Sequence, residues 1–354
     1  MKKQGALFLF SLLLLSIGLV LISEKYFVTN RAGKDSYLMY RSTALASDWF
    51  DIISKIKKEK GLLSPESNNL KYPGLIGLEY SDITTTLGSL DAKYTANNPE
   101  FAALTVKFLI EAGIDSTSTV GVISSGSFPS LAISTLAAIQ TIGAKVILIT
   151  SLGSSSYGAN DPNATWIDIE KWLRENGGLK YRSNMVSLGA ENDNGLGLQD
   201  DGIITLEQAA LRCGVTLFRP ASFEQSLNTK LDLLIKGNIK LLINIGGNQI
   251  AMGKCPHGSS ISNGFHRQLT TCNDSDRGLI FRLSEQGVPV LHYLNIKSLA
   301  VEYGLPIAPS QTYYKSELIY FENVHNKLFA LFAIIFIAAL LLLNSFLKKE
   351  KKFI

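Results

Sequence analysis

The longest hydrophobic runs of the chain lie at its two ends. No charged residue interrupts the sequence from Gly5 to Ile22 or from Leu328 to Leu347. At a rise of about 1.5 Å per helical residue, each run is long enough to cross the hydrocarbon core of a bilayer. The pattern therefore predicts one membrane-spanning helix at each end of the chain.

The first run has two interpretations, a cleaved signal peptide or a retained anchor. Its basic start, Met1-Lys2-Lys3, suits either. The apolar stretch is longer than the roughly 7–15 residues of a signal peptide core, and no small-x-small cleavage site follows it. We therefore expect a retained anchor.

Basic residues at the two ends predict the orientation in the membrane. The chain begins with MKK and carries KKEKK at 348–352, and basic flanks favour the cytoplasm. Lys25, Arg31 and Lys34 argue the other way, but a long translocated region is governed little by its own charges. The sequence thus predicts a membrane protein with two spans, cytoplasmic termini and an extracytoplasmic middle region.

The middle region alternates between short apolar runs and segments with helical spacing. The apolar runs resemble buried strands and lie at 75–79, 119–124, 144–150, 215–219, 240–246 and 288–294. The helical patterns lie at 98–113, 131–143, 164–178, 205–214 and 221–237, and a polar stretch between Gly178 and Thr205 is typical of a loop. Apolar strands separated by helices predict an α/β domain with a doubly wound, mostly parallel sheet.

These patterns divide the chain into four parts. Residues 1–24 are the N-terminal anchor, and 25–70 contain a stalk helix at 43–60 followed by a linker rich in turn-forming residues. Residues 71–325 form the extracytoplasmic α/β domain, and 326–354 form the C-terminal membrane helix with its basic tail.

Charge and cysteine content exclude several classes of function. The formal net charge of +4 owes much to the two tails, and no basic stripe interleaved with aromatic residues indicates nucleic-acid binding. Cys255 and Cys272 flank a polar loop where an extracytoplasmic setting permits a disulfide, whereas Cys213 resembles a small core residue. His257 and His266 lie in that loop without the spacing of a zinc site, so we expect neither a metal nor a cofactor.

Small and polar residues gather where the predicted strands end. In open α/β sheets ligands bind at the carboxyl ends of the strands, and four of these ends carry SSGSFPS, SLGSSSYGANDP, GGNQIAMG and a His292-to-Asn295 segment. The predicted ligand-binding residues are Ser124, Ser125, Gly126, Ser127, Ser154, Tyr157, Asn244, Gly246, Gly247 and Asn295.

The SSGSFPS turn at 124–130 has three interpretations. Its amides and hydroxyls at a helix start, with Pro129 in the first turn, can hold an anion. The same residues can make a tight turn at Gly126 with Ser127 as a helix cap. Alternatively, Ser125 or Ser127 is a nucleophile, although the G-x-S-x-G spacing is absent.

A nucleophilic serine would need a base, and His292 is the candidate. Asp161, Asp168 or Glu170 would then orient the histidine. A lone histidine in a buried strand is more often a structural group, and acids in a first helical turn usually complement the helix dipole. Asp91 and Lys93 are a further candidate pair, across a turn.

Several motifs together resemble one family, the bacterial poly-gamma-glutamate system protein. The resemblance covers roughly residues 70 to 310. Its motifs are GLEYS at 77–81, ITTTLGSL at 83–90, SGSFP at 125–129, YGA at 157–159 with Asp161-Pro162, Trp166 with Asp168 and Glu170, Asn244 with Gly246-Gly247, and GVPVLH at 287–292. Ala190 and Asn248 depart from the pattern, where glycines are expected.

The resemblance implies a pathway and no settled catalytic mechanism. It implies a membrane-anchored accessory protein of poly-gamma-glutamate synthesis or export, with the polymer or the synthase and export proteins as partners. Two alternatives stay open, a serine-dependent hydrolase or transferase acting on the gamma-glutamyl amide and a non-catalytic scaffold of the synthase. A helix start lined by hydroxyls suits the carboxylates of the polymer.

Overall fold

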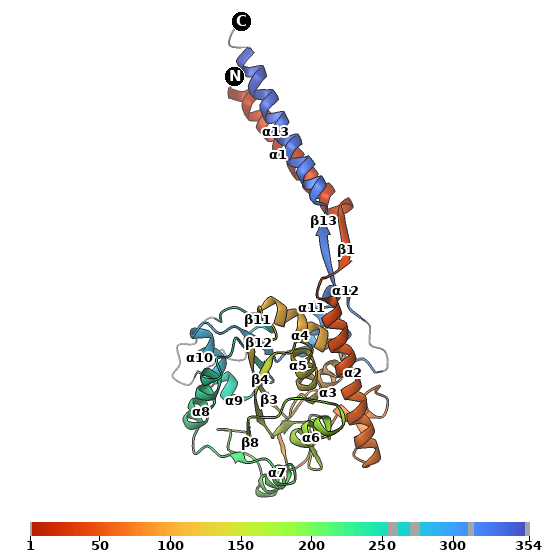
Figure 1. The fold of residues 1–354 in the computed structure, drawn as a ribbon, viewed down its shortest axis with the longest axis vertical. Helices are drawn as coiled ribbons and strands as arrows, with labels where there is room; N and C mark the ends of the chain where they lie inside the picture. Colours follow the sequence, from red (N-terminus) through yellow and green to blue (C-terminus); the bar gives the residue numbers. More distant parts are fainter. Residues whose placement is uncertain (1, 254–260, 270–276, 311–314, 351–354) are drawn as a thin grey trace. The chain divides into compact units, whose positions relative to one another are not determined.

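The computed structural model describes residues 2–253, 261–269, 277–310 and 315–350 (Figure 1). The chain forms two compact units. Residues 1–34 and 320–354 make the terminal unit, and residues 35–319 make the central unit. The two halves of the terminal unit come from opposite ends of the chain.

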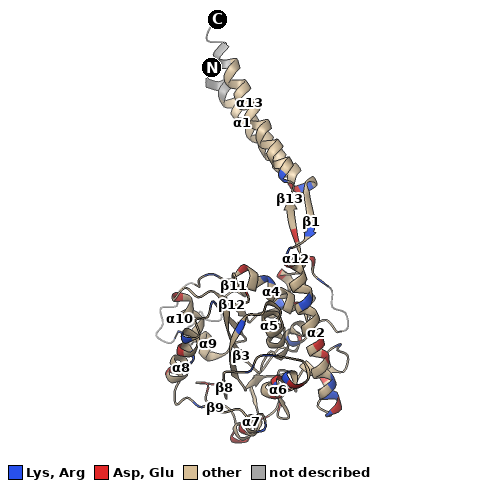
Figure 2. Ribbon diagram, viewed as in Figure 1, with Lys and Arg blue, Asp and Glu red and all other residues tan. Residues whose placement is uncertain are grey.

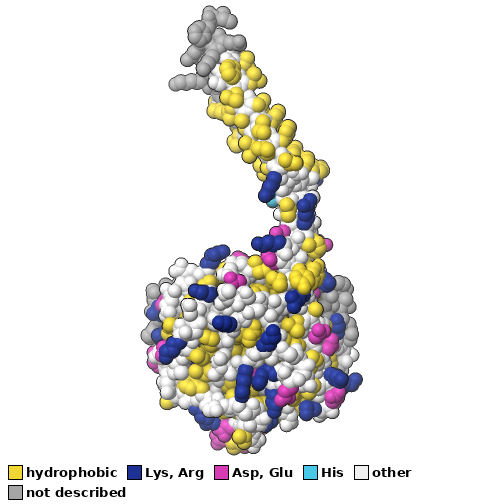
Figure 3. All heavy atoms as spheres, in the orientation of Figure 1, with side chains coloured by type: hydrophobic (Ala, Val, Ile, Leu, Met, Phe, Trp, Pro, Cys, Tyr) yellow, Lys and Arg dark blue, Asp and Glu magenta, His cyan; other side chains and the backbone are white. Residues whose placement is uncertain are grey.

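The terminal unit pairs two apolar helices and two strands. Helices α1 (Lys2–Tyr26) and α13 (Lys327–Glu350) adjoin an antiparallel ribbon of β1 (Val28–Ala32) and β13 (Phe321–His325), in which Val28 pairs with His325. Figure 2 shows that charged residues of this unit occur on the ribbon and at the helix ends beside it, while the long middle parts of the helices carry none, and Figure 3 shows hydrophobic side chains along the outside of the helices. The segments Ala6–Tyr26 and Lys327–Leu347 are long and apolar enough to cross a membrane.

A seven-stranded sheet forms the middle of the central unit. Its order is β11-β12-β10-β3-β4-β8-β9, and every neighbouring pair is parallel except β11 with β12. The strands are β3 (Thr119–Ser125), β4 (Lys145–Ser151), β8 (Met185–Ser187), β9 (Leu217–Phe218), β10 (Leu241–Ile245), β11 (Gly264–His266) and β12 (Val290–Tyr293). The predicted α/β class with a mostly parallel sheet is confirmed.

Helices pack on two sides of this sheet (Figure 1). On one face, Ile123, Ile149 and Leu242 share a core with side chains of α8 (Phe223–Lys236), α9 (Gln249–Met252) and α10 (Leu279–Glu285). Elsewhere in the unit, α5 (Pro129–Ile142) packs against α2 (Ser36–Glu59) and α4 (Glu100–Glu111). The remaining elements are α3 (Leu90–Ala96), α6 (Trp166–Asn176), α7 (Asp200–Arg212), α11 (Ile296–Glu302), α12 (Glu317–Tyr320), η1 (Pro65–Ser67), η2 (Pro73–Leu75), β2 (Thr84–Thr86) paired with β5 (Ser154–Ser155), and β6 (Asn160–Asp161) paired with β7 (Ala164–Thr165).

Local signals explain where two of the helices begin and end. Pro129 is the first residue of α5, where its missing N–H costs nothing, and Gly143 ends the helix with a φ of 86°. At the start of α6, Thr165 and Asp168 form a capping box that satisfies two otherwise unpaired amides. These signals fix the turns that follow β3 and precede α6.

Three predicted elements differ from the structure. Residues 75–79 form no strand, because Pro73 begins a short 3-10 helix there and the chain continues as a buried loop. The stretch predicted as a loop contains strand β8, which is only three residues long. The predicted stalk helix packs into the central unit, where Trp49, Phe50 and Ile53 are fully buried.

Candidate functional site

A cavity of about 510 Å³ opens at the carboxyl ends of the central strands. Hydroxyl side chains, glycines and amide side chains make up most of its wall, and Glu191 is the one charged residue among the described lining residues. The lining residues are Thr85, Thr86, Ser125, Ser151, Gly153, Gly189, Ala190, Glu191, Leu196, Gly197, Gly247, Asn248 and Gln249. We call this the first cavity.

The strand order explains why a cavity forms here. From β3 the chain moves through β4, β8 and β9 toward one edge of the sheet, and β10 then returns to the other side of β3. The loops after β3 and β10 therefore leave the sheet in divergent directions, which opens a crevice where ligands bind in open α/β sheets. Ser125 ends β3 and Gly247 follows β10, so both line this crevice.

The loop from Gly189 to Gly197 forms one wall of the first cavity and depends on a buried carboxylate. Asp193 Oδ1 accepts hydrogen bonds from Ser187 Oγ at 2.7 Å and Ser151 Oγ at 3.2 Å. Its Oδ2 accepts from Ser226 Oγ at 2.7 Å and Lys230 Nζ at 2.5 Å. Asp193 therefore joins this loop to β4, β8 and α8.

Asp193 and Lys230 form an ion pair with side chains only 1% exposed. Burial lowers the pKa of Lys230, and the neighbouring Asp193 carboxylate opposes this effect. Removing one member of such a pair leaves an uncompensated buried charge. The loop keeps a backbone that is strained for non-glycine residues, with positive φ at Ala190, Asn192 and Asp193.

Asn248 joins the loop after β10 to the neighbouring strand. Its Oδ1 accepts a hydrogen bond from the amide of Ile250 at 2.9 Å, and its Nδ2 donates to Ser151 Oγ at 2.7 Å. Next to it, Gln249 Oε1 accepts from the amide of Asn192 at 2.8 Å. Asn248 and Gln249 thus hold two walls of the first cavity together.

The Ser-Gly-Ser turn contributes only Ser125 to the cavity. A Cβ at Gly126 would lie 2.9 Å from the carbonyl oxygen of Leu152, so close packing against protein backbone requires this glycine. Ser127 Oγ accepts a hydrogen bond from the amide of Ser155 at 3.0 Å, and α5 is capped at Phe128 without a side-chain bond. Ser127 is therefore not a helix cap, which was one of the three interpretations of this turn.

Lys93 donates hydrogen bonds at the Ser-Gly-Ser turn and forms no ion pair with Asp91. Its side chain is buried, and Nζ donates to Ser155 Oγ at 2.8 Å and to the carbonyl oxygen of Ser127. The ammonium also lies 3.9 Å from the centroid of the Phe128 ring. Burial lowers the pKa of Lys93 to about 7. No described carboxylate forms a salt bridge with it.

His292 lies buried in strand β12, and its Nε2 has no hydrogen-bond partner among the described residues. Its Nδ1 lies 3.0 Å from Nδ2 of Asn244, the residue beside it on β10, and the side chain is fully buried. Burial lowers the pKa of His292 to about 4. No hydrogen bond among the described residues joins His292 to a serine, so Ser125, Ser127, His292 and Asp168 do not form a hydrogen-bonded triad.

The other predicted ligand residues lie outside the wall of the first cavity. Asn295 caps α11, Ser154 donates to the neighbouring carbonyl of Ser155, and Ser124 is fully buried. Tyr157, Asn244 and Gly246 are likewise absent from the described lining residues. Their proximity to strand ends places them near the cavity without making them part of its surface.

The described residues include Cys213 but only part of the loop in which the sequence permits a disulfide. Cys213 is half-buried, its Sγ donates to Asp168 at 3.3 Å, and burial raises its pKa to about 12. Cys255, Cys272 and His257 lie outside the described residues. Within the described ranges, no group of three or more His, Cys, Asp or Glu side chains could hold a metal ion.

Comparisons with known proteins do not assign a family. No family model and no curated protein matches the chain. Among solved structures, an archaeal alanine:glyoxylate aminotransferase is similar at 13% identity and a TM-score of 0.13, over 66% of this chain and 48% of that one. A likeness this weak carries no argument about fold or activity.

Proposed function

We propose that the chain is a membrane-anchored accessory protein of poly-gamma-glutamate synthesis or export. In this proposal α1 and α13 span the bacterial membrane, both termini are cytoplasmic, and the doubly wound central unit binds the polymer or a synthase partner outside. The motif resemblance supports the pathway, and the two apolar terminal helices support the anchoring. The first cavity is the observation that carries the binding function.

The chemistry of the first cavity suits one glutamyl unit. Hydroxyls of Thr85, Thr86 and Ser125 and the amides of Asn248 and Gln249 can bond both an amide and a carboxylate. Glu191, by contrast, repels a run of negative charges. The first cavity would therefore hold a single unit through neutral groups.

Filling the first cavity with a large side chain tests this proposal in the full-length protein in detergent micelles. Thr86 is exposed and lines the cavity, and its strand position tolerates an aromatic residue. Thr86→Trp should abolish measurable binding of fluorescent poly-gamma-glutamate. Leu87→Trp is the matched control, because Leu87 is 90% exposed and lies outside the cavity wall. Equal binding by both variants would contradict the proposal.

Reporter fusions test the proposed topology. Reporters at both ends should stay cytoplasmic, and one inserted at the exposed turn residue Ser116 should be exported. A cytoplasmic signal from Ser116 would place the central unit on the wrong side for meeting exported polymer. Deleting the gene and measuring the amount and length of surface polymer tests the role in the cell.

A second candidate function, cleavage or transfer of the gamma-glutamyl amide, is favoured by one contact. Ser151 lines the first cavity, and its hydroxyl donates to the Asp193 carboxylate at 3.2 Å. A serine hydroxyl beside a fixed carboxylate is an arrangement that nucleophilic catalysis can use. If this function holds, the full-length protein shortens added polymer and Ser151→Ala does not. Unchanged chain length with the wild-type protein rejects it.

A further inference from the structure

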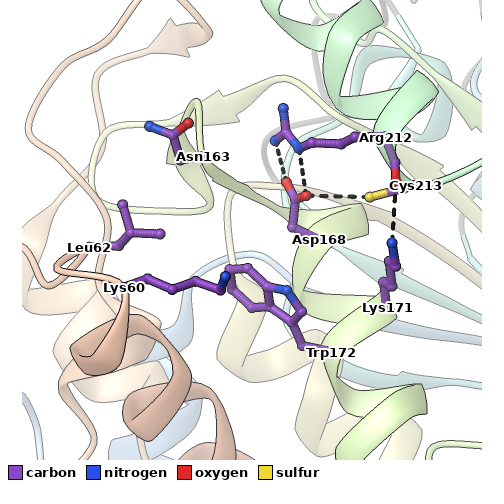
Figure 4. A pocket seen from close by; sticks show the side chains of 8 residues that line it. All are labelled: Lys60, Leu62, Asn163, Asp168, Lys171, Trp172, Arg212 and Cys213. Carbon is purple, nitrogen blue, oxygen red and sulfur yellow. Dashed lines mark hydrogen bonds and ion pairs between the residues drawn. The ribbon is translucent and has the colours of Figure 1, made fainter.

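A second cavity, of about 600 Å³, lies where three helices end or begin. Lys60 follows α2, while Asp168, Lys171 and Trp172 belong to α6, and Arg212 ends α7 (Figure 4). It shares no lining residue with the first cavity, within the part of the chain that the structure describes. We call it the second cavity.

The single carboxylate in the wall of the second cavity is already occupied. Asp168 accepts from Arg212 Nε at 2.8 Å and Arg212 Nη2 at 2.5 Å, and from the amide and hydroxyl of Thr165 at 2.9 and 2.7 Å. Cys213 Sγ is a further donor at 3.3 Å. Asp168 therefore neutralises Arg212 and has little capacity left for another cation.

Two ammonium groups remain without a carboxylate partner. Lys171 Nζ donates to the carbonyl oxygen of Arg212 at 3.2 Å, and Lys60 Nζ lies 5.9 Å from the centroid of the Trp172 ring. Among the described residues no salt bridge involves either lysine. The cavity wall therefore keeps two unpaired positive charges after the internal pair is counted, and these favour an anionic ligand.

The uncharged part of the wall indicates what kind of anion fits. Trp172 and Leu62 offer apolar surface, and Figure 4 shows their side chains beside Lys60, with Asn163 across the cavity. Methylene groups can pack on such surface while charged groups meet the lysines. An acidic chain of amino acid units has both features, whereas a polyphosphate has only the charge.

We propose that the second cavity binds carboxylates of an acidic polyamide chain through Lys60 and Lys171, with its methylene groups packed on Trp172. The identity of that chain as poly-gamma-glutamate rests on the proposed function, but the carboxylate chemistry does not. In this proposal the central unit holds one unit of the chain in the first cavity and further carboxylates of the chain in the second.

Two double charge reversals test the proposal in the full-length protein in detergent micelles. Lys60→Glu with Lys171→Glu should weaken the binding of poly-gamma-glutamate about tenfold, since each surface ion pair contributes up to about 1 kcal/mol. Lys58→Glu with Arg174→Glu is the matched control, because both residues are exposed on the same helices and lie outside the cavity wall. The control should weaken binding less than about threefold. Equal losses in the two variants overturn the proposal.

Further probes separate the chemistry of the ligand. Methyl-esterified poly-gamma-glutamate should lose the dependence on Lys60 and Lys171, and polyphosphate should bind more weakly than the carboxylate chain. Trp172→Leu should weaken binding even at 1 M salt, where screening removes most of the charge effect. Polyphosphate binding as tight as that of the carboxylate chain, with the same dependence on the two lysines, overturns the assignment to carboxylates.

The outcomes also separate this proposal from the proposed function. If Thr86→Trp abolishes polymer binding but the Lys60 and Lys171 reversal does not weaken it, the second cavity is rejected and the function stands. If poly-alpha-glutamate binds through the two lysines while poly-gamma-glutamate does not bind, the carboxylate site stands and the function is rejected. Binding of neither polymer rejects both.

Discussion

The two cavities have similar volumes, about 510 and 600 Å³, but opposite construction. The first lies at strand ends and is lined by hydroxyls, glycines and amides, with its charged pair of Asp193 and Lys230 fully buried behind the wall. The second lies at helix ends and carries its charges on the surface, where the Arg212 side chain is 37% exposed. Apart from Glu191 in its wall, the charged groups at the first cavity fix a loop, whereas Lys60 and Lys171 in the second cavity are available to a ligand.

The largest effect should come from breaking the buried pair behind the first cavity. Lys230→Met leaves the Asp193 carboxylate buried and unpaired, which should lower the free energy of unfolding by about 3–5 kcal/mol. Urea unfolding followed by tryptophan fluorescence measures it, since all three tryptophans lie in the central unit. The double variant with Asp193→Asn should recover part of the loss. A cost below about 1 kcal/mol for Lys230→Met would show that the pair does not anchor the loop.

A glycine at position 126 can be needed for close packing against the backbone or for the approach of a ligand. Its Cβ position lies 2.9 Å from the Leu152 carbonyl oxygen, so Gly126→Val should cost about 1–3 kcal/mol of stability by overpacking. Gly126→Val with wild-type stability but no polymer binding would favour ligand approach.

The buried Lys93 beside the Ser-Gly-Ser turn should make the stability of the protein depend on pH. Burial lowers its pKa to about 7 from 10.5, so between these values the unfolded chain binds a proton that the folded chain lacks. The free energy of unfolding should therefore rise with pH, by at most about 1.4 kcal/mol per pH unit. Lys57, whose pKa burial lowers to about 8, adds most of its contribution to the slope above pH 8.

Lys93 should therefore contribute most of the slope between pH 7 and 8. Wild-type stability should increase across this interval, and Lys93→Met should remove most of the increase. Lys57→Met is the matched control and should keep most of the slope below pH 8. Identical slopes for wild type and Lys93→Met would mean that Lys93 stays protonated in the folded protein.

The smallest effect is expected for the Arg212–Asp168 pair at the second cavity, where the arginine side chain is 37% exposed and the carboxylate side chain 7%. Arg212→Met removes the guanidinium from Asp168, but the amide and hydroxyl of Thr165 still donate to the carboxylate. Because the arginine is partly exposed and its charge is screened, we expect a loss of about 1 kcal/mol or less in the same unfolding measurement. A loss as large as that of Lys230→Met would remove the contrast between the two cavities.

The sequence predicted the fold best where apolar runs were continuous. Strands β3, β4, β10 and β12 and helix α5 lie where the pattern placed them. Strand β8 was missed because three residues in a polar stretch give no periodic signal. The strand predicted at 75–79 was wrong because a loop packed into the protein can be as apolar as a strand.

The site was predictable only where it follows from strand ends. Ser125 and Gly247 line the first cavity because they follow β3 and β10. Asp193 comes from a loop whose path depends on distant partners, so sequence spacing could not place it. Lys230 left one signal, since it lies on the same helical stripe as the buried Leu227 and Leu234. The second cavity is lined by residues at the ends of three helices, and no spacing in the sequence predicts that these ends lie close together.

The ribbon of β1 and β13 has a consequence for the order of assembly. Thr29 and Val324 face each other across the ribbon although 295 residues separate them. At a synthesis rate of about 5–20 residues per second, the N-terminal strand waits about 15–60 s for its partner. Residues 35–319 of the central unit are synthesised before that partner. The ribbon can therefore close only after the central unit has been synthesised, and a ribosome that stops before residue 321 leaves β1 with an unpaired edge.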